Sequence, residues 1–111
     1  MEKIANYQQA IQQILTEYAS YMPVGEGLSL ETVFDETRHH YQLIVLGWHG
    51  HEHIYKPLLH LDLINGKIWV QHNDTQFTLT EDFDRFGIPH QDIVNGLIPA
   101  RRRSFTDYAL G

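Results

Sequence analysis

Residues 60–71 read His-Leu-Asp-Leu-Ile-Asn-Gly-Lys-Ile-Trp-Val-Gln, two short runs with alternating apolar residues on either side of Asn65-Gly66. Asn-Gly is the strongest short signal for a two-residue β-hairpin, because a type I′ turn needs positive φ at both central positions. The flanking runs have the length and residue types of strands. We therefore expect two antiparallel strands, Ile54 to Ile64 and Lys67 to His72, joined by this turn.

The two-residue turn also predicts the register of these strands, since residues at equal distance from the turn face each other. We expect one face to line the core with the pairs Leu63–Ile68, Leu61–Val70 and Leu59–His72. The other face then holds the pairs Asp62–Trp69 and His60–Gln71. One large aromatic among polar groups is typical of an interface, so we predict a partner-binding surface that includes His60, Asp62, Trp69 and Gln71.

The segments before this hairpin predict one helix and two further strands. Apolar residues recur every three or four positions from Ile4 to Tyr21, which is typical of an amphipathic helix. Leu28 to Asp35 alternates like a half-buried strand. Tyr41 to Trp48 is almost continuously apolar, as expected for a central strand, and we place Trp48 in the core. Pro57 cannot donate a ladder hydrogen bond, so we expect an edge position or a bulge there.

The segments after the hairpin predict short helices. Thr80 is a candidate N-cap for a helix that begins at Glu81, and Pro89 to Val94 suits a second short helix. Without a linker or repeat, the chain is expected to be a single domain over residues 1–111. The predicted fold class is α+β: an N-terminal helix, a four-stranded antiparallel sheet in a meander of hairpins, and short C-terminal helices.

Composition restricts the possible functions. The chain has 111 residues, no cysteine and a formal net charge of −6. Disulfides and thiolate chemistry are excluded, and we expect a cytoplasmic protein with no membrane span. The acidic charge has the wrong sign for direct grip on phosphates, so any DNA contact is expected to be indirect. Arg101, Arg102 and Arg103 form one local basic patch, which we include among the candidate partner-binding residues.

Histidine is frequent, with eight residues in the chain. His49, His51 and His53 alternate within five residues, and an extended His-x-His-x-His run could present three nitrogens to zinc or nickel. The run falls where a hairpin loop belongs, whereas built metal sites recruit ligands from separate elements. We therefore expect no cofactor and keep metal binding by these histidines as a weaker alternative.

Catalysis has weak support in the sequence. His60 and Asp62 share a strand face and could form the His-carboxylate pair of a general base. However, no serine lies in a nucleophile-elbow motif, and no glycine-rich phosphate loop joins a strand to a helix. We predict that the chain is not an enzyme.

Residues along nearly the whole chain resemble one family, the XisI-type excision controlling factors of cyanobacteria, named for programmed removal of the fdxN element. The likeness lies in the helix from Tyr7 to Tyr18, Phe34-Asp35, Arg38, Tyr41, Gly47-Trp48, the block from His60 to Gln71, Gly87-Ile88-Pro89, Asp92-Ile93-Val94, Arg103, Thr106, Tyr108 and Ala109. The histidine-rich run from His49 to His53 departs from the resemblance.

The resemblance implies an accessory factor for site-specific DNA excision that contacts a recombinase or an XisH-type companion and does not cut DNA itself. The exposed aromatic also allows a homodimer through the sheet face or an edge strand. An alternative is an antitoxin-like partner that neutralises a nuclease-like companion, with Glu81, Asp82 and Asp84 masking a basic active site.

Overall fold

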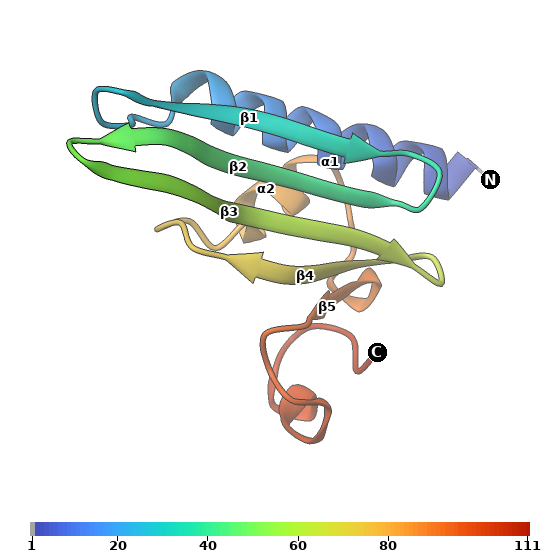
Figure 1. Cartoon of the computed structure of the whole chain (residues 1–111). Coiled ribbons are helices and arrows are strands. Elements are labelled where there is room, and N and C mark those ends of the chain that lie inside the picture. Colours follow the sequence, from blue (N-terminus) through green and yellow to red (C-terminus); the bar gives the residue numbers. More distant parts are fainter. Residues whose placement is uncertain (1) are drawn as a thin grey trace.

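The computed structural model describes residues 2–111, and Figure 1 shows their arrangement. The elements in chain order are α1 (Glu2–Tyr21), β1 (Leu28–Asp35), β2 (His40–His49), β3 (Glu52–Ile64), β4 (Lys67–Asn73), α2 (Thr80–Arg85), η1 (His90–Asp92), β5 (Ile93–Asn95) and η2 (Ala100–Phe105). The chain thus has the expected N-terminal helix, sheet and short C-terminal helices. None of the described helices is long and apolar enough to cross a membrane.

The sheet has five strands in the order β1-β2-β3-β4-β5, and this corrects the four-stranded prediction. The first four form the expected antiparallel meander, whereas β5 runs parallel to β4. The second predicted helix shrinks to the single turn η1, because Ile93 and Val94 are buried in the strand beside Ile68 and Trp69. A parallel neighbour requires a crossover connection, here the segment that contains α2, so its partner cannot be identified from local sequence.

The Asn-Gly hairpin is confirmed close to the turn. Asn65 and Gly66 have φ values of 53° and 78°, and Ile64 pairs with Lys67. The expected pairs hold as far as Leu61–Val70. Beyond them the prediction was wrong: a bulge at Gln71 lets His60 pair with His72 and Leu59 with Asn73. One extra residue in a strand shifts every later pair, and the turn alone cannot predict it.

A second irregularity confirms the expectation for Pro57. Leu43 pairs with Leu59 and Ile44 with Pro57, so Leu58 is the extra residue of a bulge between β2 and β3. The β3–β4 ladder begins only at Leu59, so Pro57 needs no ladder donor on that side.

The core lies between α1 and one face of the sheet. Figure 1 shows α1 and α2 behind the sheet and the front face uncovered over β1 to β3. We call this uncovered side the outer face. Completely buried core side chains include Ile11, Ile14, Leu15, Tyr41, Leu43, Leu59, Leu61 and Ile68. Because strand side chains alternate, every residue that follows a core residue in β2 and β3 points to the outer face.

The start of α2 differs from the prediction. Leu79, with φ 71° and ψ −11°, occupies the N-cap position, and its side chain is buried in the core. Thr80 is the first helical residue, and its hydroxyl shares a hydrogen bond with the Tyr108 hydroxyl instead of capping the helix. Burial of an apolar side chain thus takes precedence over the capping preference here.

Tyr7 couples α1 to the C-terminal half of the chain and gives the fold an expected alkaline sensitivity. Its hydroxyl donates to the Asp92 carboxylate, to which Lys3 Nζ also lies at 3.1 Å. The pKa of Tyr7 is raised to about 12, mainly by burial and then by the hydrogen bond and charge of Asp92. The protonated Tyr7 hydroxyl therefore makes its full contribution to the free energy of unfolding below the unfolded-state pKa near 10. This contribution is lost as the pH rises toward the folded-state pKa of about 12.

We therefore expect the stability gap between wild type and Tyr7→Phe to shrink by about 1 kcal/mol between pH 9 and pH 11. Urea unfolding at both pH values measures this gap. Tyr55→Phe, at an exposed tyrosine, should behave like wild type at both. A Tyr7→Phe gap that stays constant with pH would contradict the assignment.

Candidate functional site

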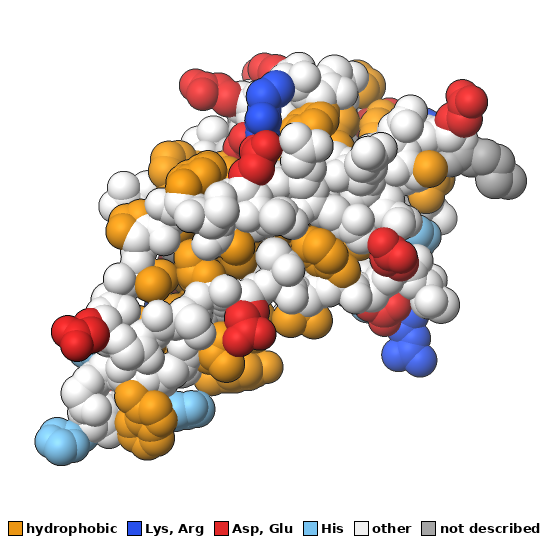
Figure 2. All heavy atoms as spheres, turned by 90° about the horizontal axis from the view of Figure 1, so that it is seen from above, with side chains coloured by type: hydrophobic (Ala, Val, Ile, Leu, Met, Phe, Trp, Pro, Cys, Tyr) orange, Lys and Arg blue, Asp and Glu red, His pale blue; other side chains and the backbone are white. Residues whose placement is uncertain are grey.

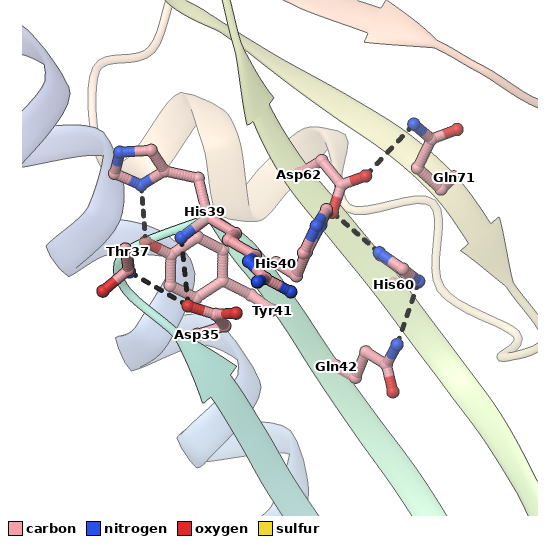
Figure 3. Close-up of polar contacts among 10 residues, drawn as sticks. Asp35, Thr37, His39, His40, Tyr41, Gln42, His60, Asp62 and Gln71 are labelled. Atoms are coloured by element: carbon pink, nitrogen blue, oxygen red, sulfur yellow. Dashed lines mark hydrogen bonds and ion pairs between the residues drawn. The ribbon is translucent and has the colours of Figure 1, made fainter.

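A cluster of polar side chains lies on the outer face where β2 and β3 pair. The register places His40 opposite Asp62 and Gln42 opposite His60, so the four side chains project from two cross-strand pairs that are neighbours on the outer face. Figure 3 shows them together, with Gln71 reaching in from β4. We call His40, Gln42, His60, Asp62 and Gln71 the polar cluster. The predicted residues His60, Asp62 and Gln71 are thus brought together, whereas His40 and Gln42 were missed.

The carboxylate of Asp62 is the centre of the polar cluster. Its Oδ1 lies 2.8 Å from His40 Nδ1 and 2.7 Å from His60 Nε2, and its Oδ2 accepts from Gln71 Nε2 at 3.2 Å. The Asp62 side chain is 9% exposed, compared with 25% for His60 and 50% for His40. An acidic group therefore lies shielded on a face that is otherwise open to solvent.

The contacts determine the ring tautomers of the neutral histidines. Both imidazole nitrogens that face Asp62 Oδ1 must carry a proton, because a carboxylate oxygen only accepts. His60 Nδ1 is then an acceptor, in agreement with its 3.2 Å contact to Gln42 Nε2. His60 is thus held by Asp62 on one side and Gln42 on the other, which is the arrangement of an oriented base or metal ligand.

The turn between β1 and β2 positions His40. Asp35 Oδ1 accepts from the backbone amides of Thr37 and Arg38 at 3.0 Å each, and these bonds lower the pKa of Asp35 despite some desolvation. His39 has a left-handed backbone, with φ 61°, and its carbonyl accepts from the Leu63 amide. This fixed turn sets the point at which β2 begins with His40.

Trp69 lies on the outer face as predicted but is half-buried. The Arg103 guanidinium lies 4.9 Å above its ring, a cation–π contact. Arg103 also donates to the carbonyls of Ile98 and Leu110, so its role in the fold is to hold the C-terminal segment against β4. Arg101 and Arg102 are exposed on η2. The basic patch is therefore divided between one packing residue and two exposed ones.

The histidine-rich run does not form a cluster. His49 ends β2, His51 lies in the turn and His53 lies in β3, where its ring packs 4.9 Å from that of Trp48. Among residues 2–111, the group of metal-ligand type is a different one, His40, His60 and Asp62. The three histidines of the alternative prediction, His49, His51 and His53, are therefore not part of this group.

Trp48 is 57% exposed, which corrects its expected place in the core. The buried residues Tyr41, Leu43 and Val45 occupy alternate positions of β2, so Trp48 falls on the outer face. Tyr55 of β3, 69% exposed, lies on the same face, opposite Leu46. Counting alternate residues from Tyr41 would have placed Trp48 on the outer face, but the almost unbroken apolar run concealed the alternation.

These outer-face residues make an apolar area beside the polar cluster. Its members are Val33, Ile44, Leu46, Trp48, Tyr55 and Pro57. Figure 2 shows hydrophobic side chains and histidines gathered at the end of the molecule where the β2–β3 turn lies. We call these six residues the apolar area. The outer face therefore has an apolar half and a polar half.

The acids of the antitoxin-like alternative lie on α2 and are partly engaged within the fold. Asp82 accepts from the Tyr18 hydroxyl and lies 3.3 Å from Arg85 Nη2. Asp84 Oδ1 is 3.1 Å from His90 Nε2. Glu81 is exposed. These internal contacts reduce the negative charge that α2 presents to a partner.

The fold and the geometry of the site define a class: small α+β proteins with α1 and α2 on one face of a five-stranded mixed sheet, and exposed aromatic and clustered polar side chains on the other. The model of the XisI protein family matches residues 1–110, so the chain belongs to that family. No curated protein sequence matches the chain.

Two crystal structures share the fold over almost their entire length. One is a XisI-like protein from Anabaena variabilis ATCC 29413, 35% identical, with a TM-score of 0.91 over 97% of this chain and 99% of that chain. The other is the fdxN element excision controlling factor XisI from the same organism, 27% identical, with a TM-score of 0.85 over 98% of this chain and 99% of that chain.

Proposed function

We propose that this chain is a controlling factor for the excision of a DNA element, and that it acts through a companion protein without cutting DNA. The observation that carries the proposal is the similarity to the fdxN element excision controlling factor, which spans 98% of this chain. Family membership over residues 1–110 supports it. The companion would be an XisH-type factor or the recombinase itself.

The surface chemistry supports protein contacts. The net charge of −6 disfavours strong binding to phosphates. Trp48 and Tyr55 stand exposed where the outer face is uncovered over β2 and β3, and exposed aromatics of this kind anchor protein interfaces. We place the docking site for the companion on the apolar area, with these two rings as anchors.

A non-enzymatic role is consistent with the contacts of the polar cluster. Within the described chain, the hydrogen-bond partners of His60 and Asp62 are an imidazole and two amides. A His-carboxylate pair needs a neighbouring hydroxyl or an activated water to act as a nucleophilic centre. The polar cluster contains no hydroxyl and so offers no side-chain nucleophile, and we do not propose catalysis from it.

Capture of the companion protein tests the proposal. The product of the neighbouring gene is immobilised, and binding of wild type, Trp48→Ala and Tyr55→Ala is measured by titration. We expect each variant to bind at least ten-fold more weakly, because truncating an anchoring aromatic typically costs ~2 kcal/mol or more. Circular dichroism establishes that the variants are folded.

Phe105→Ala is the matched control, since Phe105 is 88% exposed on η2 and is not part of the apolar area. Its binding should equal that of wild type. Equal binding by all three variants would overturn the docking site. Loss of binding on Glu81→Arg alone would favour the antitoxin-like alternative. In cells, Trp48→Ala should also reduce excision of a reporter element, and unchanged excision would contradict the excision-control role.

A further inference from the structure

We propose that His40, His60 and Asp62 form a binding site for one divalent transition-metal ion of the zinc type on the outer face (Figure 3). Among residues 2–111, they are the group of three His, Cys, Asp or Glu side chains whose ligand atoms all lie within 4.8 Å of one another. Two imidazole nitrogens and a carboxylate oxygen are ligands that zinc and its neighbours in the transition series accept.

The charge balance of the polar cluster favours a cation. Asp62 is shielded from water, and in the described part of the chain its ion-pair partners are His40 and His60. Both partners are imidazoles, and no lysine or arginine of residues 2–111 forms an ion pair with this carboxylate. A shielded carboxylate is costly unless it is paired or coordinates a metal, and a dication between the three side chains would supply that pairing.

Two glutamines give the proposed ligands the support that built metal sites have. Gln71 Nε2 holds Asp62 Oδ2, and the Gln42 amide contacts His60 Nδ1. When a metal replaces the proton on His60 Nε2, the ring proton moves to Nδ1 and needs an acceptor. The Gln42 amide can provide one by turning its oxygen toward the ring, because an amide offers both a donor and an acceptor.

The geometry needs only a small adjustment. The nitrogens of His40 and His60 lie 2.8 and 2.7 Å from Asp62 Oδ1. Ligands bound to a tetrahedral zinc ion at 2.0–2.1 Å are about 3.3 Å apart, so the three side chains must spread by roughly half an ångström. His40 is half-exposed at the start of β2, which leaves its ring free to move. The remaining coordination position would face solvent.

Zinc titration of the metal-stripped, untagged protein tests the proposal. Competition with a chromophoric chelator should show one equivalent of Zn²⁺ bound by wild type. His40→Gln and His60→Gln should each weaken binding by about 100-fold, and Gln42→Leu by about ten-fold, as outer partners of metal ligands do. Zn²⁺ should raise the Tm of wild type and leave that of His40→Gln unchanged, because only ligand bound to the folded state stabilises it.

The matched control removes the histidine-rich run instead. A triple variant with His49→Gln, His51→Gln and His53→Gln should bind Zn²⁺ like wild type. Loss of binding in this variant would mean that the ion is held at the β2–β3 turn, and the proposal would be wrong. Absence of stoichiometric binding by wild type would also overturn it and would leave the polar cluster as a hydrogen-bonded network. Capture of the companion protein without added metal tests the proposed docking site independently of zinc binding.

Discussion

Gly47→Ala should be among the most damaging single substitutions in this protein. Gly47 of β2 has φ 137°, and a Cβ there would lie 2.1 Å from the carbonyl oxygen of Gly27, a backbone atom that cannot move aside. Left-handed strain and overpacking each cost ~1–3 kcal/mol, and we expect a combined loss of about 4 kcal/mol in the free energy of unfolding. Urea unfolding and Tm measure this loss.

Gly50→Ala is the matched control for Gly47→Ala. Gly50 also has positive φ, at 63°, but a Cβ there would meet nothing within 4 Å. The expected loss is only the left-handed penalty of about 1–2 kcal/mol. Equal losses for the two variants would show that the close approach of Gly27 and Gly47 is not the dominant cost. Because Gly47 precedes Trp48, its variant should also lose the companion protein if the proposed docking site is right.

Leu61→Ala should cost about 3–4 kcal/mol, since Leu61 is completely buried at the centre of the sheet and faces α1. The transfer free energy of the lost methyl and methylene groups and the cavity left behind both contribute. The substitution should lower the free energy of unfolding. It should leave the zinc affinity of the folded protein unchanged, because Leu61 points to the core whereas its neighbours His60 and Asp62 point to the outer face. Chemical unfolding combined with zinc titration separates the two quantities.

Ile64→Ala is the control in the same strand. Ile64 is exposed at the hairpin end of β3, so its truncation should cost about 1 kcal/mol or less. A loss equal to that of Leu61→Ala would contradict the assignment of the core to the face that holds Leu61. The pair of variants thus tests the register that also places the polar cluster on the outer face.

The two halves of the outer face suggest separate roles under these proposals. The apolar area, with Trp48 and Tyr55, would bind the companion protein. The polar cluster around Asp62 would bind a metal ion whose open position faces the same side. The two proposals can fail independently, because neither anchor of the apolar area is a ligand of the proposed ion.

Some structural features were mispredicted from the sequence for the same reason: they depend on partner residues that are distant in the chain. The bulge at Gln71 shifts the partner of His60, and the parallel strand from Ile93 to Asn95 takes the last two residues of the helix expected from Pro89 to Val94. Trp48 was misplaced because an almost continuous apolar run hides which positions face the core. His40 and Gln42 join the polar cluster only through the β2–β3 register.

The sequence by itself determined the hairpin at Asn65-Gly66, the amphipathic helix α1 and the family resemblance, because these depend on local backbone preferences and on residue order. It also placed His60 and Asp62 on one side of a strand, since alternation is a local property. Only the tertiary structure decided that His40 completes their cluster and that Arg103 covers Trp69. Those contacts join residues far apart in the chain, and they form only when strand pairing and the C-terminal segment fix the positions of both partners.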